Sequence, residues 1–425
     1  MGNYVLRCTA CGRDHADDGL RVHCDASHGP SFLRTVYGSA PFKAHENERG
    51  ILRYKQWLPL RNEVEGTGLT ATFQSATLNR ALDTPNLWIA FNGYWPQRGA
   101  HLTTATFKEL EALAVVGRFP RDGTVLVTAS AGNTAVSLAS ACSRAGIPAL
   151  IVVPQRVIPA LRFSEPLADS VKFIGVENGT YDDAIAFARA VATIPGFSFE
   201  GGAANVARRD GIGTTMLRSV EVMGSLPEYY LQPVGSGAGA LAAHEAALRL
   251  IEDGLYGTQL PRLYLVQNSP SAPIDASWKL RSPVLVGLED DAAQRAATGA
   301  MAAQVLGIRV PPYAISGGLF GALTQSCGET GAVTNEETRR SSALFTRLEG
   351  IDIEPAAAVA LAGLQAGLAS GAIERDARIL LHLTGGGREA SLELRPYSAR
   401  ANLLVQHVAA GRDRAAEHAA RLFAA

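Results

Sequence analysis

The stretch Thr124-Val125-Leu126-Val127-Thr128, followed after Ala129 by Ser130-Ala131-Gly132-Asn133-Thr134, decides the predicted fold. Its first five residues are apolar or β-branched, which is typical of a strand buried on both faces of a parallel sheet. The small polar residues after them are typical of a turn, and a helix is predicted over Thr134–Arg144. The stretch therefore predicts a strand that passes through a tight loop into a helix, the unit from which parallel sheets are built.

The same alternation of strand and helix continues along most of the chain. Further strands are predicted at residues 87–91, 149–153, 171–174, 229–233, 263–267 and 379–383. Further helices are predicted at residues 106–116, 182–192, 213–223, 240–252, 292–306, 355–369 and 414–423. Because strands and helices alternate, we expect βαβ units, parallel-rich sheets and the α/β class.

Composition excludes several classes of protein. The 425-residue chain is 47% hydrophobic and 19% charged, which suits a globular protein with a sizeable core. Its 39 basic and 40 acidic residues give a formal net charge of −1, so neither nucleic acid nor an anionic membrane surface is an expected partner. No apolar run approaches the ~20 residues of a membrane span, and the start of the chain lacks the apolar core of a signal peptide. These absences predict a cytoplasmic location.

The five cysteines indicate a reducing compartment and an N-terminal metal site. Cys8-Thr9-Ala10-Cys11-Gly12 is a Cys-x-x-Cys knuckle, and Cys24 and His28 follow it. Cys8, Cys11, Cys24 and His28 offer the thiolate and imidazole ligands of a tetrahedral structural Zn site. A zinc ribbon normally closes with a second Cys-x-x-Cys pair, whereas the last pair here is Cys-x3-His. A ribbon that has lost its metal is therefore the alternative.

Lys108 and three small-residue loops form the candidate functional site. Lys108 follows Thr103-Thr104-Ala105-Thr106-Phe107 at a helix start, and taken alone it would be an ordinary helix lysine. The loops are Ser130–Thr134, Gly235-Ser236-Gly237-Ala238-Gly239 and Thr384-Gly385-Gly386-Gly387. Pyridoxal phosphate (PLP) needs a lysine for its aldehyde, donors for its phosphate, a partner for its pyridine nitrogen and a clamp for the substrate carboxylate. The order and spacing of these elements are typical of such a site.

Each loop has a predicted role. The substrate carboxylate is expected to bind Thr104, Ser130, Ala131, Gly132, Asn133 and Thr134, and Asn133 is also expected to contact the cofactor. The backbone from Gly235 to Gly239 is expected to hold the cofactor phosphate, because alternate glycines allow close approach. Thr384 is expected to face the pyridine nitrogen. A dinucleotide fingerprint is the rival interpretation of the glycine loop, but Glu252-Asp253 ends a helix instead of the next strand. Plain tight turns are the other alternative.

The order of these motifs resembles that of the fold-type II PLP enzymes, the tryptophan-synthase-β class, and within it the threonine synthase branch. The N-terminal cysteines and the arm Gly50-Ile51-Leu52-Arg53-Tyr54 add to the likeness. Threonine synthases carry Asn-Pro-Thr-Gly-Ser-Phe-Lys-Asp, whereas this chain has Asn92-Gly93-Tyr94-Trp95-Pro96 and then Thr104-Ala105-Thr106-Phe107-Lys108-Glu109-Leu110-Glu111. That segment resembles the cysteate synthases, which are relatives of threonine synthase.

The resemblance implies an enzyme that carries out a PLP-dependent β-replacement. O-phospho-L-serine and sulfite would give L-cysteate and phosphate by way of an aminoacrylate, with Lys108 holding the cofactor and moving the α-proton. Both small-molecule substrates are anionic, so basic residues are expected nearby, and the candidates are Lys55, Arg98, His101, Arg208 and Lys279. Threonine synthase, or β-replacement with another nucleophile, is the alternative. A catalytically silent binding protein that keeps the fold is the third hypothesis.

The resemblance also implies how the chain is divided. Residues 1–49 are expected to form an N-terminal Cys-rich element, residues 50–104 and 200–425 the large PLP-binding domain, and residues 105–199 a small α/β domain that can move. Enzymes of this class are often dimeric, so a homodimer is an expected assembly.

Overall fold

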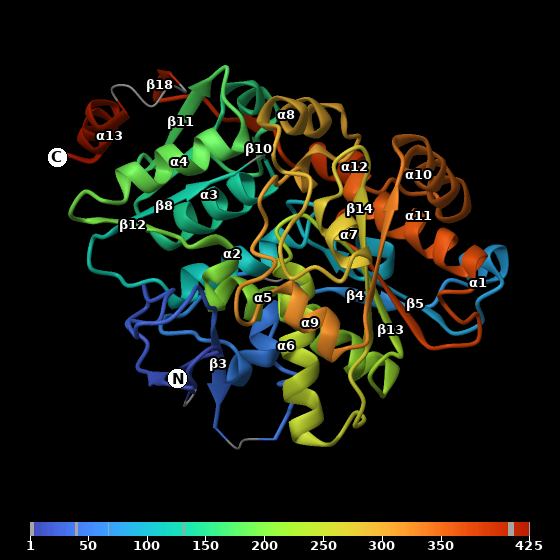
Figure 1. The fold of residues 1–425 in the computed structure, drawn as a ribbon. Coiled ribbons are helices and arrows are strands. Elements are labelled where there is room, and N and C mark those ends of the chain that lie inside the picture. Colours follow the sequence, from blue (N-terminus) through green and yellow to red (C-terminus); the bar gives the residue numbers. More distant parts are fainter. Residues whose placement is uncertain (1–3, 39–40, 67, 131, 407–411, 425) are drawn as a thin grey trace.

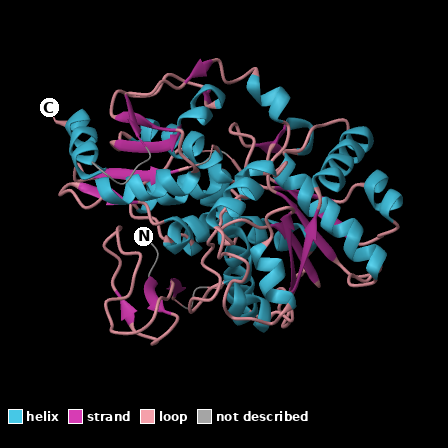
Figure 2. Cartoon of the chain, turned by 45° about the horizontal axis from the view of Figure 1, so that its top comes forward, coloured by secondary structure: helices cyan, strands magenta, loops and turns pink. Residues whose placement is uncertain are grey.

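Two sheets of mainly parallel strands form the body of the protein, and the N-terminal region forms a small antiparallel sheet (Figure 1). The structure is a computed structural model that describes residues 4–38, 41–66, 68–130, 132–406 and 412–424. Helices surround both main sheets (Figure 2). Within the described ranges, every helix is too short or too polar to cross a membrane.

The smaller of the two main sheets has five parallel strands in the order β12-β8-β9-β11-β18. They are β8 (Val125–Ala129), β9 (Ala149–Pro154), β11 (Val171–Glu177), β12 (Phe197–Phe199) and β18 (Leu403–Gln406). α3 (Asn133–Ala145) covers one face, while α4 (Tyr181–Val191) and α13 (Arg412–Ala420) cover the other. β8 and β9 are buried along their whole length, as parallel strands enclosed by helices are expected to be.

The larger sheet has six strands in the order β15-β14-β13-β16-β5-β4. They are β4 (Ala71–Phe73), β5 (Leu87–Phe91), β13 (Tyr229–Pro233), β14 (Arg262–Asn268), β15 (Glu329–Val333) and β16 (Ile379–Leu383). Neighbours are parallel except at the edge, where β4 runs antiparallel to β5. One face packs against α1 (Ala76–Leu82), α10 (Asn335–Glu349) and α11 (Pro355–Ser370). The other packs against α5 (Val206–Met223), α6 (Ala238–Asp253), α7 (Pro273–Lys279) and α9 (Leu319–Gln325).

The N-terminal sheet has the order β2-β1-β3 and a small core. Its strands are β1 (Tyr4–Cys8), β2 (Asp14–His15) and β3 (Leu33–Tyr37). Leu6, Cys8 and Leu33 pack with Val206 at the start of α5, so the sheet rests on the body of the protein.

Shorter elements connect these layers, and side-chain caps fix where several helices begin. The connecting elements include the 3₁₀ helix η1 (Gly50–Trp57), β6 (Tyr94–Trp95), β7 (Ala100–His101), α2 (Lys108–Arg118), β10 (Arg162–Phe163), α8 (Asp291–Ala300), α12 (Arg388–Leu392) and β17 (Tyr397–Ser398). Thr180 and Asp183 form a capping box at α4, and Thr334 and Glu337 form another at α10.

The structure confirms the predicted α/β class and most predicted elements. The strands predicted at residues 87–91, 229–233 and 379–383 coincide with β5, β13 and β16. The helix predicted at residues 213–223 is too short, because α5 begins at Val206. Asn205 caps that start by accepting the N–H of Ala207 at 3.0 Å.

The expected domain division differs from the observed sheets at the C-terminal end. The prediction places all of residues 200–425 in the large domain, but β18 pairs with β11 in the smaller sheet. Leu403 and Val405 join the apolar cluster beneath α4, and α13 packs on α4 itself. Burial of these apolar side chains explains the return of the chain to the smaller sheet.

The core of the larger sheet gives a first test of the fold. Leu381 on β16 is 0% exposed, so we expect Leu381→Ala to lower the free energy of unfolding by about 2–5 kcal/mol. Leu280, at the end of α7, is 70% exposed, and Leu280→Ala should change it by about 0.5 kcal/mol or less. Urea denaturation followed by tryptophan fluorescence measures both, and equal effects would contradict the fold.

Candidate active site

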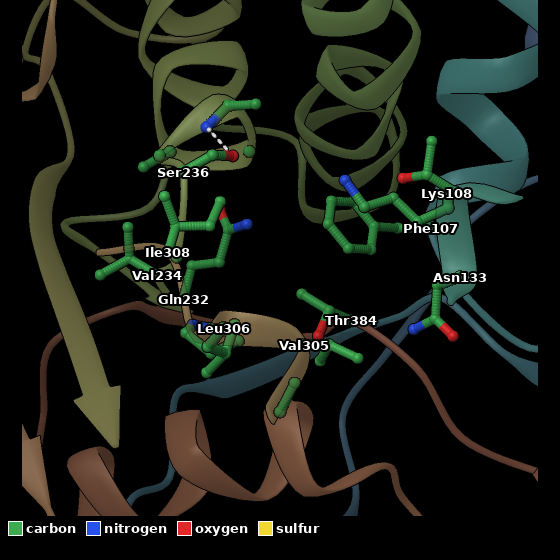
Figure 3. A pocket seen from close by; sticks show the side chains of 18 of the residues that line it. Phe107, Lys108, Asn133, Gln232, Val234, Ser236, Val305, Leu306, Ile308 and Thr384 are labelled. Carbon is green, nitrogen blue, oxygen red and sulfur yellow. Dashed lines mark hydrogen bonds between the residues drawn. The ribbon is translucent and has the colours of Figure 1, made fainter. Parts of the chain in front are cut away.

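One cavity brings Lys108 together with the three predicted loops. The loops follow the carboxyl ends of β8, β13 and β16, which is where α/β proteins bind ligands. In Figure 3, Lys108 and Asn133 lie on one side, Ser236 and Val234 lie opposite, and Thr384 lies between them. The predicted residues that line the cavity are Lys108, Ser130, Gly132, Asn133, Thr134, Gly235, Ser236, Gly237, Ala238, Gly239 and Thr384.

The partly buried side chain of Lys108 places its amine beside a buried carboxylate. Lys108 begins α2, and its backbone N–H donates to Thr106 Oγ1 at 3.2 Å. Its Nζ donates to Glu111 Oε2 at 2.9 Å and lies 4.5 Å from the centroid of the Phe107 ring. Burial lowers the pKa of Lys108, although Glu111 acts in the opposite direction. A lowered pKa makes the neutral amine, the form that attacks an aldehyde, more abundant.

Glu111 links Lys108 to a buried arginine. Glu111 Oε1 accepts from Arg208 Nη1 at 2.8 Å and from Thr134 Oγ1 at 3.0 Å. Arg208 also donates to the Glu200 carboxylate, through Nε at 3.0 Å and through Nη2. Burial acts to lower the pKa of Arg208, but the two carboxylates outweigh burial and raise that pKa above its ordinary value. Two cations and two carboxylates thus compensate one another, and Glu111 is shared by both cations.

The loop after β8 is held by the hydroxyl of Ser130. Ser130 Oγ accepts the N–H of Gly132 at 3.0 Å and that of Ala135 at 2.9 Å, so it caps the start of α3. The N–H groups of Asn133 and Thr134 lie in the first turn, where a helix offers them no acceptor. These amides can bind an anion such as a carboxylate.

The glycine loop after β13 fits closely against its neighbours. Gly237 has a φ of 82° and caps α6 in the left-handed region that favours glycine. A Cβ on Gly235 would lie 2.9 Å from the Leu306 carbonyl oxygen, and one on Gly239 would lie 2.0 Å from the Gln232 side chain. Backbone crowding at Gly235 and the positive φ of Gly237 therefore favour glycine, whereas a Cβ at Gly239 would displace the Gln232 side chain. The N-terminal end of α6 is left open to an anion in the cavity.

The loop after β16 pairs with the chain that precedes Lys108. Phe107 donates its N–H to the Thr384 carbonyl at 3.0 Å, and Gly386 donates to the Ala105 carbonyl at 3.1 Å. A Cβ on Gly385 would lie 2.7 Å from the Glu354 carboxylate, so a larger residue there would displace the Glu354 side chain. The two hydrogen bonds fix the position of Thr384 relative to Lys108.

Sequence reasoning missed Glu354 and Tyr181, which also line the cavity. Glu354 accepts from Asn133 Nδ2 at 2.9 Å and from Arg388 Nη1 at 3.2 Å. Burial raises the pKa of Glu354, and Arg388 opposes that effect. Burial also raises the pKa of Tyr181 to about 12, against the influence of Arg208. Glu354 directly precedes Pro355, and proline is common at the first position of a helix. The sequence therefore predicts that a helix begins here, but it gives no signal for a functional site.

Several predicted residues lie elsewhere. Thr104 is not among the residues that line the cavity, and its contact with the substrate stays a prediction. Its N–H donates to Glu109 Oε2 at 2.9 Å, and its hydroxyl accepts from Ser137 at 3.3 Å. Ala131 lies outside the described residues. Among the basic candidates Lys55, Arg98, His101, Arg208 and Lys279, the described cavity lining includes Arg208 alone.

The four predicted metal ligands meet at a separate place, in residues 4–37 from β1 to β3, which we call the N-terminal unit. The ligand atoms of Cys8, Cys11, Cys24 and His28 all lie within 4.8 Å of one another.

Comparison with known proteins agrees with this geometry. The sequence profile described as pyridoxal-phosphate dependent enzyme matches residues 70–385. The cysteate synthase of Methanosphaerula palustris is 44% identical over 92% of this chain and 92% of its own length. The chain belongs to the cysteate synthase family of pyridoxal-phosphate dependent enzymes. Another member, the cysteate synthase of Methanocorpusculum labreanum, is 42% identical over 91% of this chain and 93% of its own.

A solved structure shares the fold at lower identity. Threonine synthase from Escherichia coli superposes with a TM-score of 0.55 and 15% identity, over 79% of each chain. This likeness supports the predicted fold-type II architecture, which the cysteate synthase family shares.

The cavity fits the cofactor of the family. Four groups face this one cavity. They are the Lys108 amine, the start of α6 beside three closely packed glycines, and the side chains of Asn133 and Thr384. PLP needs an amine for its aldehyde, amides for its phosphate and polar contacts for its ring. Lys108, the backbone from Gly235 to Gly239, Asn133 and Thr384 would supply these contacts.

Replacement of Lys108 tests the assignment of the cofactor lysine. We expect Lys108→Ala to lack the visible absorbance of covalently bound cofactor, because the variant has no amine at this position. Borohydride reduction of the unmodified protein, followed by peptide mass mapping, should place the cofactor mass on the peptide with Lys108. Lys279→Ala is the control, since Lys279 is exposed and pairs with Asp275. Cofactor mass on another lysine would contradict the assignment.

Replacement of Glu111 tests the buried charge network. Glu111→Gln leaves Lys108 and Arg208 with one fewer carboxylate, so we expect the free energy of unfolding to fall by about 3 kcal/mol. Glu336 makes exposed contacts with Arg339 and Arg340, and Glu336→Gln should cost less than about 1 kcal/mol. Chemical denaturation of both variants measures the difference.

The same variant should shift the pH dependence of cofactor capture. Glu111 raises the pKa of Lys108, so its loss lowers that pKa and keeps the amine neutral at lower pH. We therefore expect the pH profile of PLP uptake by apoprotein to be shifted to lower pH in Glu111→Gln. The rate of uptake is followed by absorbance at each pH. An unchanged pH dependence would show that Glu111 does not act on the amine, and a shift to higher pH would contradict the expected sign.

Proposed function

We propose that this enzyme converts O-phospho-L-serine and sulfite to L-cysteate and phosphate. The observation that carries the proposal is its 38–44% identity to cysteate synthases over about nine-tenths of the chain. The segment from Asn92 to Glu111, which differs from the threonine synthase pattern, supports the same choice of substrates.

The helix starts would bind the anionic ends of the reactants. The N–H groups of Asn133 and Thr134 at the start of α3 would hold the substrate carboxylate. The start of α6 would hold the cofactor phosphate in the same way. These contacts orient the amino acid so that its α-carbon lies near Lys108 Nζ.

Lys108 would move the proton during the reaction. When bound, PLP supplies the electron sink that makes the α-proton acidic. Lys108 Nζ, with a pKa lowered by burial, can accept that proton before phosphate leaves the β-carbon. Lys108 can return the proton after sulfite has formed the new carbon–sulfur bond. Glu111, 2.9 Å away, would steady the protonated amine between these two steps.

Tyr181 and Arg208 are candidates to receive the second anion. Both line the active-site cavity and the neighbouring hollow, which also contains Arg189 and His23. Tyr181, with its pKa of about 12, keeps its proton and can donate it in a hydrogen bond. Arg208 adds positive charge, although Glu111 and Glu200 already compensate much of it. The leaving phosphate and incoming sulfite would pass this pair.

The cytoplasmic location and the homodimer remain proposals. Reduced Cys8, Cys11 and Cys24 are consistent with a reducing compartment. Sedimentation at several protein concentrations would determine the assembly.

A substrate-pair assay tests the proposed reaction. Holoenzyme is incubated with phosphoserine or phosphohomoserine as donor, and with sulfite, sulfide or water as acceptor, and products are identified by mass spectrometry. We expect cysteate and an equal amount of phosphate from phosphoserine with sulfite. Faster formation of threonine from phosphohomoserine would favour threonine synthase activity. Turnover with sulfide but not with sulfite would show that the nucleophile is sulfide. Lys108→Ala, at matched concentration, controls for contaminating activity.

A further inference from the structure

We propose that the N-terminal unit binds a structural zinc ion through Cys8, Cys11, Cys24 and His28 Nε2, and that this ion supports one wall of the active site. A tetrahedral site with Zn–S bonds of about 2.3 Å places two sulfurs about 3.8 Å apart. The sulfurs of Cys11 and Cys24 are 3.8 Å apart, and Cys8 Sγ is 3.3 Å from His28 Nε2. These two distances fit a tetrahedral site, and all four ligand atoms lie within 4.8 Å of one another.

The groups around two of the sulfurs favour thiolates. The backbone N–H of Ala10 points to Cys8 Sγ and that of Ala26 points to Cys24 Sγ, each at 3.4 Å. Ser31 Oγ lies 3.3 Å from Cys8 Sγ. Donors at this distance stabilise the deprotonated sulfur, which is the form that binds metal.

Hydrogen bonding selects His28 over His15 as the fourth ligand. His28 Nδ1 lies 2.7 Å from the Gly29 carbonyl, which requires the proton to be on Nδ1 and leaves the lone pair of Nε2 for the metal. His15 Nε2 lies 3.3 Å from Cys24 Sγ, and His15 groups with Cys24 and Asp25 instead of with Cys8 and Cys11, so it could complete only a site with a single thiolate. His15 is therefore a donor to the sulfur and not a ligand.

The N-terminal unit has little regular secondary structure and a small apolar core. Between β1 and β3, residues 9–32 contain the two-residue strand β2, and the apolar cluster of the unit centres on Leu6, Cys8, Leu33 and Val206. Units of this size commonly need a metal or disulfides because their cores are too small. The cysteines of this unit are free, so a metal is the group that fits.

The proposed site is connected to the wall of the active-site cavity. Thr9 Oγ1 and the Phe32 N–H donate to the Ser316 carbonyl at 2.8 and 2.9 Å, and the Ser316 N–H donates to the Pro30 carbonyl at 3.1 Å. Ile308, upstream in the same segment, lines the active-site cavity, and residues 310–315 line the neighbouring hollow. The loops that hold the metal thus hold this segment in place.

A second connection reaches the helix that begins at Lys108. Arg118 ends α2, and its buried guanidinium donates to both Asp17 carboxylate oxygens at 2.9 and 2.7 Å. It also donates to the Arg21 carbonyl at 2.6 Å and to Asn205 Oδ1 at 3.1 Å. Asp17 and Arg21 lie in the loop between Cys11 and Cys24, so ordering that loop also orders this contact.

Metal analysis of holoenzyme, purified without chelator, tests the site. We expect about one zinc per chain, and the cobalt-substituted protein should show the thiolate-to-cobalt absorption of a tetrahedral site. Cys11 is exposed, so Cys11→Ser should lose the metal with little loss of packing, while Cys327→Ser, at an exposed cysteine elsewhere, should retain it. Metal-free wild-type protein, a different stoichiometric metal, or zinc retained in Cys11→Ser would overturn the proposal.

The two histidine variants identify the fourth ligand. His28→Ala should release zinc to a chelator at least tenfold faster than wild-type protein, whereas His15→Ala should keep the full zinc content. Loss of zinc in His15→Ala with retention in His28→Ala would overturn the assignment of the ligand.

Hydrogen exchange tests the supporting role separately from activity. In Cys11→Ser, amide exchange of peptides covering residues 313–318 should rise at least tenfold, while peptides from α11 should be unchanged. The visible absorbance of the bound cofactor confirms that the same sample is holoenzyme. Unchanged exchange at residues 313–318 in metal-free protein would overturn the link between the metal and the cavity wall.

Discussion

Four charged side chains lie together in the interior of the protein, and their positive and negative charges must balance. This requirement constrains how the helices at the centre of the protein pack. Lys108 and Arg208 supply the positive charges, and Glu111 and Glu200 supply the negative ones. An uncompensated charge in this position would cost several kcal/mol. The four residues come from α2, α5 and the end of β12, so charge balance and helix packing constrain each other. A cofactor that bonded to the Lys108 amine would change this balance, so Glu111 and Arg208 would influence the chemistry as well as the packing of the helices.

Most of the segment that separates this chain from threonine synthases, residues 92–106 ahead of Phe107 and Lys108, lies behind the cavity and does not line it. Asn92 donates its N–H to the Leu383 carbonyl, and a Cβ on Gly93 would lie 2.2 Å from the Gly386 carbonyl oxygen. The segment therefore packs on the loop that carries Thr384. Its influence on substrate choice would be indirect, through the positions of Thr384 and Lys108. Residues that shape a backbone in this way can distinguish families without touching the substrate.

Much of the fold could be predicted because its signals are local. Buried parallel strands such as β5, β13 and β16 appear in the sequence as short apolar runs, and the loop after β13 appears as three alternate glycines. The pairing of β18 with β11 could not be predicted, because Leu403–Gln406 is short and its partner lies more than two hundred residues earlier. Glu354 and Tyr181 were missed for a similar reason. Each stands at a helix start, and its place in the cavity depends on how distant elements pack.

The pairing of β18 with β11 also limits how the two main sheets can move. The chain passes between the sheets after β5, again after β12, and a third time between β16 and β18. Two bodies joined by three covalent crossings cannot separate or slide freely, so closure around a substrate would have to be a hinge rotation with its axis near those crossings. The third crossing begins at Thr384, and the first contains Lys108. The two residues that would grip the cofactor therefore lie next to the axis, where a rotation displaces atoms least. The cofactor would keep its position relative to Lys108 and Thr384 while the outer edge of the cavity opens and closes.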